Sequence, residues 1–353
     1  MPSLRTAVAR LFFCGIPGPT LDAATRRLHA DTPFGGVVLF RENAGQPEAL
    51  RALARAIHAL DPALPPLVAI DHEGGRVHRL APPFTHFPPA ATVAAHGLGA
   101  VRAVAAAMAR ELAAVGIDVT FAPVLDVATN PENPIIGTRA FGITPETATA
   151  CALAAFRATR KLGLICCGKH FPGHGDTATD SHLELPVVRK ARRPLVRTEI
   201  LPFRRAIAAG IPMLMTAHVR YPALDPRAPA TLSRPILTGL LRARLGFRGV
   251  VCSDDLEMRA IADHHPPGDA ATAALAAGAD VLLVCHRQDH LRTAVGAVER
   301  AVKDGRLPEA RIADAYRRVV ALARWRLKHS VPVRLSAIGC GAHARLNESL
   351  RAG

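Results

Sequence analysis

The segment Leu164-Ile165-Cys166-Cys167-Gly168-Lys169-His170 is a short apolar run that ends in two ionisable residues. Such near-continuous hydrophobicity is typical of a strand that is covered on both faces of a parallel sheet. Similar runs recur along the chain, with helix-like segments between them. The predicted strands are residues 11–16, 36–40, 67–71, 119–125, 164–170, 213–217, 250–254 and 281–284.

The segments between these runs have the spacing and end signals of helices. Several stop directly before a glycine, which is a common residue at helix C-termini. The predicted helices cover residues 47–60, 100–115, 145–162, 198–209, 234–245, 268–277 and 291–304, with a last one over 307–328. Eight strand–helix repeats predict an α/β protein with a single (β/α)₈ barrel over residues 1–330. Residues 331–353 are interpreted as a C-terminal tail with a short helix.

A doubly wound parallel sheet is the alternative fold, but the GxGxxG turn that commonly follows its first strand is absent. The chain has 353 residues, of which 49% are hydrophobic and 21% charged. This mixture excludes a disordered chain, a collagen or a small disulfide-bonded protein. Every long apolar stretch is interrupted before roughly 18 residues, so we expect no membrane span.

The chain carries 44 basic and 29 acidic residues, a net charge of +15. No basic run is interleaved with aromatic residues, and we expect no nucleic-acid partner. The seven cysteines are odd in number and form no CxxC pair. We therefore expect buried free thiols in a cytoplasmic protein. The apolar stretch that follows Arg10 is too short for a signal sequence and is interpreted as the first strand.

Ionisable residues follow six of the eight predicted strands. The active sites of barrel enzymes lie at the C-terminal ends of the strands, so this pattern predicts an enzyme. The residues at these ends are Asp71, Asp126, Lys169, His170, His218, Asp254, Asp255 and His286.

The segment 168–182 is the densest in such groups. It is compatible with a metal site, with a mobile loop that carries a proton-transfer group, or with a solvated loop. Asp180 and His182 are two residues apart, so both side chains lie on one side of an extended loop. A carboxylate placed in this way can orient an imidazole and raise its pKa.

Asp254 and Asp255 are neighbours on one strand, and only one of them can face the barrel axis. Periodicity does not say which. Gly74 and Gly75, after the third strand, allow the backbone to approach a ligand. Taken singly, Arg79 and Arg139 are more typical of surface charges than of ligand contacts.

Four motifs contain most of these candidate residues: Asp71-His72-Glu73-Gly74-Gly75-Arg76-Val77, Lys169-His170-Phe171-Pro172-Gly173-His174-Gly175-Asp176, Asp180-Ser181-His182 and Ser253-Asp254-Asp255-Leu256-Glu257-Met258. Taken together, they resemble the glycoside hydrolase family 3 β-N-acetylhexosaminidases, the single-domain bacterial type of peptidoglycan recycling. The likeness runs from about residue 8 to about residue 328, and the family usually has Gln where His72 stands.

The resemblance implies a role for each candidate residue. Asp254 matches the nucleophile that forms a covalent glycosyl-enzyme with retention of configuration. His182 matches the acid/base, which Asp180 holds. The residues that match those holding the N-acetylglucosamine ring are Asp71, Arg79, Arg139, Lys169 and His170.

The resemblance also implies a substrate and a setting. The expected reaction removes terminal N-acetylglucosamine from anhydro-muropeptides in the cytoplasm, without a metal or cofactor. We expect a monomer whose partner is a small carbohydrate.

Three alternatives stay open. The first is a phosphorylase that uses the same site, with phosphate as the acceptor in place of water. The second is a metal-dependent hydrolase built on His170, His174, Asp176, Asp180 and His182. The third is a non-catalytic barrel that binds sugar or nucleic acid.

Overall fold

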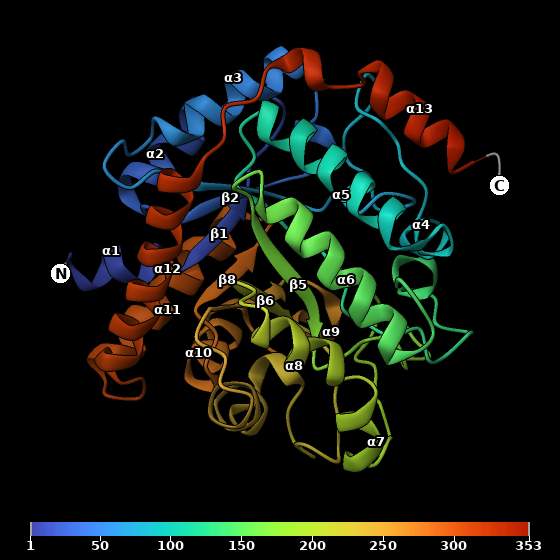
Figure 1. Ribbon diagram of the computed structural model, residues 1–353. Coiled ribbons are helices and arrows are strands. Elements are labelled where there is room, and N and C mark those ends of the chain that lie inside the picture. Colours follow the sequence, from blue (N-terminus) through green and yellow to red (C-terminus); the bar gives the residue numbers. More distant parts are fainter. Residues whose placement is uncertain (1, 352–353) are drawn as a thin grey trace.

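The computed structural model describes residues 2–351 and shows a closed barrel of eight parallel strands (Figure 1). Each strand pairs with the next, and β1 pairs with β8, which closes the ring. The predicted barrel is confirmed, and the doubly wound alternative is wrong because an open sheet keeps two edge strands. The strands are β1 (Phe12–Gly15), β2 (Gly36–Leu39), β3 (Leu67–Ile70), β4 (Val119–Thr120), β5 (Ile165–Phe171), β6 (Met213–Thr216), β7 (Val250–Asp255) and β8 (Val281–Val284).

Helices surround the strands (Figure 1), and none in the described residues is long and apolar enough to cross a membrane. The predicted positions are occupied by α3 (Pro47–His58), α5 (Gly97–Ala114), α6 (Pro145–Arg160), α8 (Leu201–Ala208), α10 (Pro267–Ala277), α11 (Gln288–Lys303) and α12 (Glu309–His329). Helices that the sequence analysis did not predict are α1 (Leu4–Ala9), α2 (Ala23–Asp31), α4 (Ala90–Ala95), α7 (Arg192–Arg197) and α9 (Arg259–Ala262).

Two predicted elements take a different form. The helix predicted over residues 234–245 is a π-helix, Pro235–Arg244, which ends with a bond from Leu245 N–H to the Leu240 carbonyl, five residues earlier. The strand predicted over residues 119–125 contains only β4. Its regular pairing with β5 stops at Thr120 and returns as one bridge at Val124, because Pro123 has no N–H to donate.

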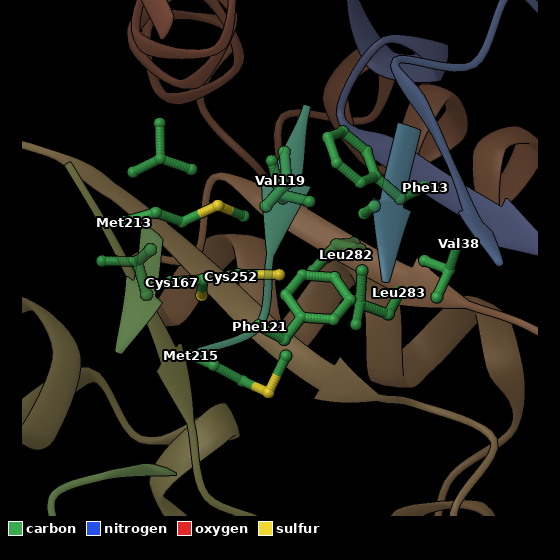
Figure 2. Close-up of a cluster of buried hydrophobic side chains, with 14 of the residues drawn as sticks. Phe13, Val38, Val119, Phe121, Cys167, Met213, Met215, Cys252, Leu282 and Leu283 are labelled. Carbon is green, nitrogen blue, oxygen red and sulfur yellow. The ribbon is translucent and has the colours of Figure 1, made fainter. Parts of the chain in front are cut away.

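Side chains from several strands fill the interior of the barrel (Figure 2). The barrel is therefore a packed core with no pore, and a ligand has to bind above it, at the strand ends. Figure 2 labels Phe13, Val38, Val119, Phe121, Cys167, Met213, Met215, Cys252, Leu282 and Leu283, all of which are buried.

The C-terminal segment packs on the outside of the barrel, where α13 (Gly341–Ser349) lies beside α5 (Figure 1). The carboxylate of Glu111, buried on α5, accepts hydrogen bonds from Gly339 N–H at 3.1 Å and His343 Nδ1–H at 2.7 Å. The same carboxylate accepts bonds from the backbone and the hydroxyl of Thr85. One buried side chain thus joins the tail, a helix and a loop.

Candidate active site

A pocket of about 110 Å³ opens at the C-terminal ends of the strands. Seven of the eight residues predicted for the site line this pocket, and the eighth, Asp180, contacts one of them. The seven are Asp71, Arg79, Arg139, Lys169, His170, His182 and Asp254.

The deep wall of the pocket is a cluster of paired charges. Lys169 Nζ lies 2.5 Å from Asp71 Oδ1 and 2.7 Å from Glu73 Oε1. The Arg139 guanidinium holds both oxygens of Glu73, with Nε–Oε2 at 2.9 Å and Nη2–Oε1 at 2.8 Å. Burial opposes the charge of Glu73, but Arg139 and Lys169 hold its pKa well below the usual range. Glu73 therefore stays ionised and fixes both cations.

Glu73 was not predicted as a site residue, although it lies inside one of the quoted motifs. Its side chain is only 5% exposed and does not line the pocket. In the sequence, Glu73 was recognisable only as an acidic residue two positions after the candidate Asp71. In the fold, it pairs with two candidate cations, Lys169 and Arg139. Sequence spacing does not reveal that Lys169, 96 positions later, folds against it.

Asp126 orients His170 from below the pocket. Its buried carboxylate accepts bonds from the backbone N–H groups of His170 and His174, and from His170 Nδ1 at 2.7 Å. Although burial opposes ionisation, these two histidines lower the pKa of Asp126. Since Nδ1 is bound to Asp126, Nε2 is the ring nitrogen of His170 that remains for a ligand.

Asp254 lies on β7, with its half-buried carboxylate in the pocket. Burial opposes its ionisation, but His218, His170 and the N–H of Asp255 lower its pKa. The carboxylate is thus ionised at neutral pH, as a nucleophile must be.

Asp255 has different contacts. Its carboxylate accepts the N–H of Glu257 at 3.1 Å and lies 3.2 Å from His286 Nε2. It is not among the residues that line the pocket. The structure therefore decides the question that periodicity left open, because Asp254 and not Asp255 faces the site.

The loop after β5 presents His182 to the pocket. Asp180 Oδ1 lies 2.8 Å from His182 Nδ1 and also accepts the backbone N–H of His182 at 2.7 Å. The His182 side chain is 62% exposed. Because Asp180 takes Nδ1, the opposite nitrogen, Nε2, is available for proton transfer.

The five residues of the metal-site alternative are divided among separate contacts. His170 and His174 share Asp126, Asp176 pairs with Lys190 at 2.7 Å, and Asp180 pairs with His182. Within residues 2–351, no group of three or more His, Cys, Asp or Glu side chains is arranged to hold a metal ion.

Comparison with known proteins gives the family. The model of the glycosyl hydrolase family 3 N-terminal domain matches residues 4–322. A beta-hexosaminidase of Alkalilimnicola ehrlichii is 41% identical over 334 residues, which cover 88% of this chain and 92% of the relative. One from Pseudomonas aeruginosa is 40% identical over 290 residues, which cover 81% and 85%.

Solved structures of family 3 enzymes match this chain as well. A family 3 beta-N-acetylglucosaminidase from Paenibacillus has a TM-score of 0.95 at 38% identity, covering 99% of this chain and 68% of that one. NagZ from Neisseria gonorrhoeae, in complex with N-trifluoroacetyl-D-glucosamine, has a TM-score of 0.73 at 32% identity, covering 89% and 98%. The chain is a glycoside hydrolase, and it belongs to glycosyl hydrolase family 3.

Proposed function

We propose that this hydrolase is a retaining β-N-acetylglucosaminidase that removes terminal N-acetylglucosamine from anhydro-muropeptides. One observation carries the proposal: an ionised carboxylate, Asp254, and an imidazole held by a carboxylate, His182, line one pocket whose deep wall is a charged cluster. The names of the relatives as beta-hexosaminidases, and the N-acylglucosamine bound in the Neisseria structure, support the choice of sugar.

The deep wall suits a sugar ring, because it offers acceptors and donors to several hydroxyls. Asp71 is the acceptor, and the donors are Lys169, Arg79, Arg139 and His170. Ion pairs of Asp71 with Lys169 and Arg79 hold these groups in place. Such prior fixing reduces the ordering cost at the moment of binding.

In the proposed first step, the Asp254 carboxylate attacks the anomeric carbon as the bond to the leaving oxygen breaks. His182 gives its proton to that oxygen. In the second step, His182 takes a proton from water, the water oxygen attacks the anomeric carbon, and Asp254 leaves. Two inversions retain the β-configuration. The carboxylate separation that distinguishes retaining from inverting enzymes does not apply, because the second group is a histidine.

We also propose that the protein works as a monomer in the cytoplasm. Six of the seven cysteines are buried free thiols, as is typical of a reducing compartment.

Product analysis with a purified N-acetylglucosaminyl-anhydromuramyl peptide tests the proposal. We expect free N-acetylglucosamine, with the β-anomer as the first species seen by NMR, whether or not phosphate is present. N-acetylglucosamine 1-phosphate would instead establish the phosphorylase, and a first α-anomer would contradict the double displacement. Loss of activity on removal of metal, with recovery on its return, would establish the metal-dependent alternative.

A further inference from the structure

The base of the loop that carries His182 is fixed to the barrel wall at His174. The backbone N–H of His174 donates to Asp126 at 2.7 Å, and its carbonyl accepts Asn133 Nδ2–H at 2.9 Å. At the next position, Gly175, an added Cβ would lie 1.7 Å from the Val127 carbonyl oxygen. The backbone therefore approaches the wall too closely for any side chain at Gly175.

The His174 ring is buried, and both of its nitrogens have hydroxyl partners. Nδ1 lies 2.9 Å from Thr177 Oγ1, and Nε2 lies 3.0 Å from Ser181 Oγ. Burial lowers the pKa of His174 to about 4, so the ring is neutral at neutral pH and carries one N–H.

The neighbouring bonds decide which nitrogen carries that hydrogen. The Thr177 hydroxyl donates its hydrogen to the His174 carbonyl at 3.1 Å. It has no second hydrogen, so all these bonds form together only if Nδ1–H donates to Thr177 Oγ1. Nε2 is then an acceptor, and the Ser181 hydroxyl donates to it.

Ser181 directly precedes His182, and like His174 it is among the residues that line the pocket. It is 2% exposed, whereas the side chain of His182 is 62% exposed. Its carbonyl also accepts the N–H of Ala260 at 3.3 Å. The bond from Ser181 to His174 thus ties the exposed end of the loop to its buried base, across seven residues of chain.

We propose that His174 is a positioning residue, which holds His182 at the pocket by accepting the hydrogen bond of Ser181. The inference rests on the proposed acid/base role of His182. It also gives His174 a role distinct from proton transfer to substrate, since both ring nitrogens are engaged within the protein.

The test compares two leaving groups, because a general acid matters most when the leaving oxygen is basic. Ser181→Ala and His174→Asn both remove the hydrogen bond between residues 181 and 174. The amide of the Asn variant can still bond to Thr177, so the other contact of this position is kept. Both variants should lose kcat/KM on an N-acetylglucosaminyl disaccharide by about 2- to 13-fold more than on the 4-nitrophenyl glycoside, the range equivalent to one neutral hydrogen bond. His174→Gln, whose amide oxygen can accept from Ser181, should recover most of this loss.

The controls separate positioning from general damage. Asp176→Asn alters the same loop at the ion pair with Lys190, and it should change both substrates by the same factor. When His182→Ala is already present, adding Ser181→Ala should not change the ratio of kcat/KM between the disaccharide and the 4-nitrophenyl glycoside. Equal losses on both substrates in Ser181→Ala, or no loss at all, would overturn the proposal for His174. If His182→Ala itself shows no leaving-group dependence, the acid/base assignment in the proposed function fails instead.

Discussion

At the scale of single residues, the role of each ionisable side chain in the site depends on the neighbours that pair with it. The motifs predicted eight site residues, and the structure brings seven of them into one pocket with Asp180 beside them. The motifs did not predict the supporting role of Glu73 or of Asp126. These two act through side chains that are remote in sequence, namely Lys169 and His170, so that local spacing carries no sign of their roles.

Asp254→Ala should reduce turnover by on the order of 10⁴-fold or more, because it removes the attacking group. Asp255→Ala should retain turnover, since that carboxylate supports Glu257 and His286 outside the pocket. Steady-state kinetics on a chromogenic N-acetyl-β-glucosaminide, with folding checked by circular dichroism, would measure both. An active Asp254→Ala beside an inactive Asp255→Ala would show that the assignment is reversed.

We expect His72 and His78 to make the folded protein less stable in acid. Their ring centroids are 4.3 Å apart, and none of the four ring nitrogens has a hydrogen-bond partner. Burial, followed by the nearby His78, His86 and Arg79, lowers the pKa of His72 well below its usual value, although Glu73 acts in the opposite direction. Burial, followed by His86, lowers the pKa of His78 to about 4.

The direction of the pH effect on stability follows from the number of protons that the folded and unfolded chains bind. Below a pH of about 6.5 the unfolded chain protonates these histidines while the folded chain does not, so stability is lost as the pH falls toward 4. His72→Gln should reduce the loss between pH 7 and pH 5 by about 2 kcal/mol, at about 1.4 kcal/mol per pH unit. Urea unfolding at both pH values measures this, with exposed His96→Gln as the control. A pH dependence in His72→Gln that equals that of the unsubstituted protein would contradict the account.

At the scale of elements, the sequence predicted those that have strong local signals. The apolar runs predicted all eight strands, and α3 and α6 begin at the predicted positions, Pro47 and Pro145. The missed α2 has only nine residues, and its signal was Asp22, whose side chain accepts the N–H of Thr25. The π-helix Pro235–Arg244 has the same apolar spacing as an α-helix over so short a stretch, so that periodicity could not distinguish them.

The attachment of the tail gives a prediction at this scale. Gly339 has a φ of +59°, and an added Cβ would lie 2.2 Å from the Pro83 carbonyl oxygen. Gly305 has a φ of +73° with nothing within 4 Å of an added Cβ. Both alanine substitutions lower the stability because alanine disfavours a positive φ. Gly339→Ala also displaces the tail, because its Cβ would clash with the Pro83 carbonyl. We expect it to lower the free energy of unfolding by about 1–3 kcal/mol more than Gly305→Ala. Equal losses in urea unfolding would show that the tail does not pack closely there.

At the scale of the whole molecule, the closed barrel buries most of its thiols. Burial raises the pKa of Cys14 and Cys166 to about 12, and the reactive form of cysteine is the thiolate. Cys340 alone is half-buried among the seven. A thiol reagent should therefore modify one cysteine quickly in the native protein and all seven in denaturant. Cys340→Ser should abolish the fast phase, and a second fast-reacting thiol would contradict the burial described.

The proposed mechanism requires a covalent bond between Asp254 and the sugar. A 5-fluoro-N-acetylglucosaminyl fluoride is the reagent that would trap this bond. The ring fluorine slows both steps, because each passes through an oxocarbenium-like transition state, while the fluoride leaving group keeps the first step faster than the second. Mass spectrometry should show a protein heavier by one fluorinated glycosyl unit, with the label on the peptide that contains Asp254. The label should be retained in Asp255→Ala and lost in Asp254→Ala. A label on another residue, or continued turnover of this reagent with no labelled protein, would contradict it.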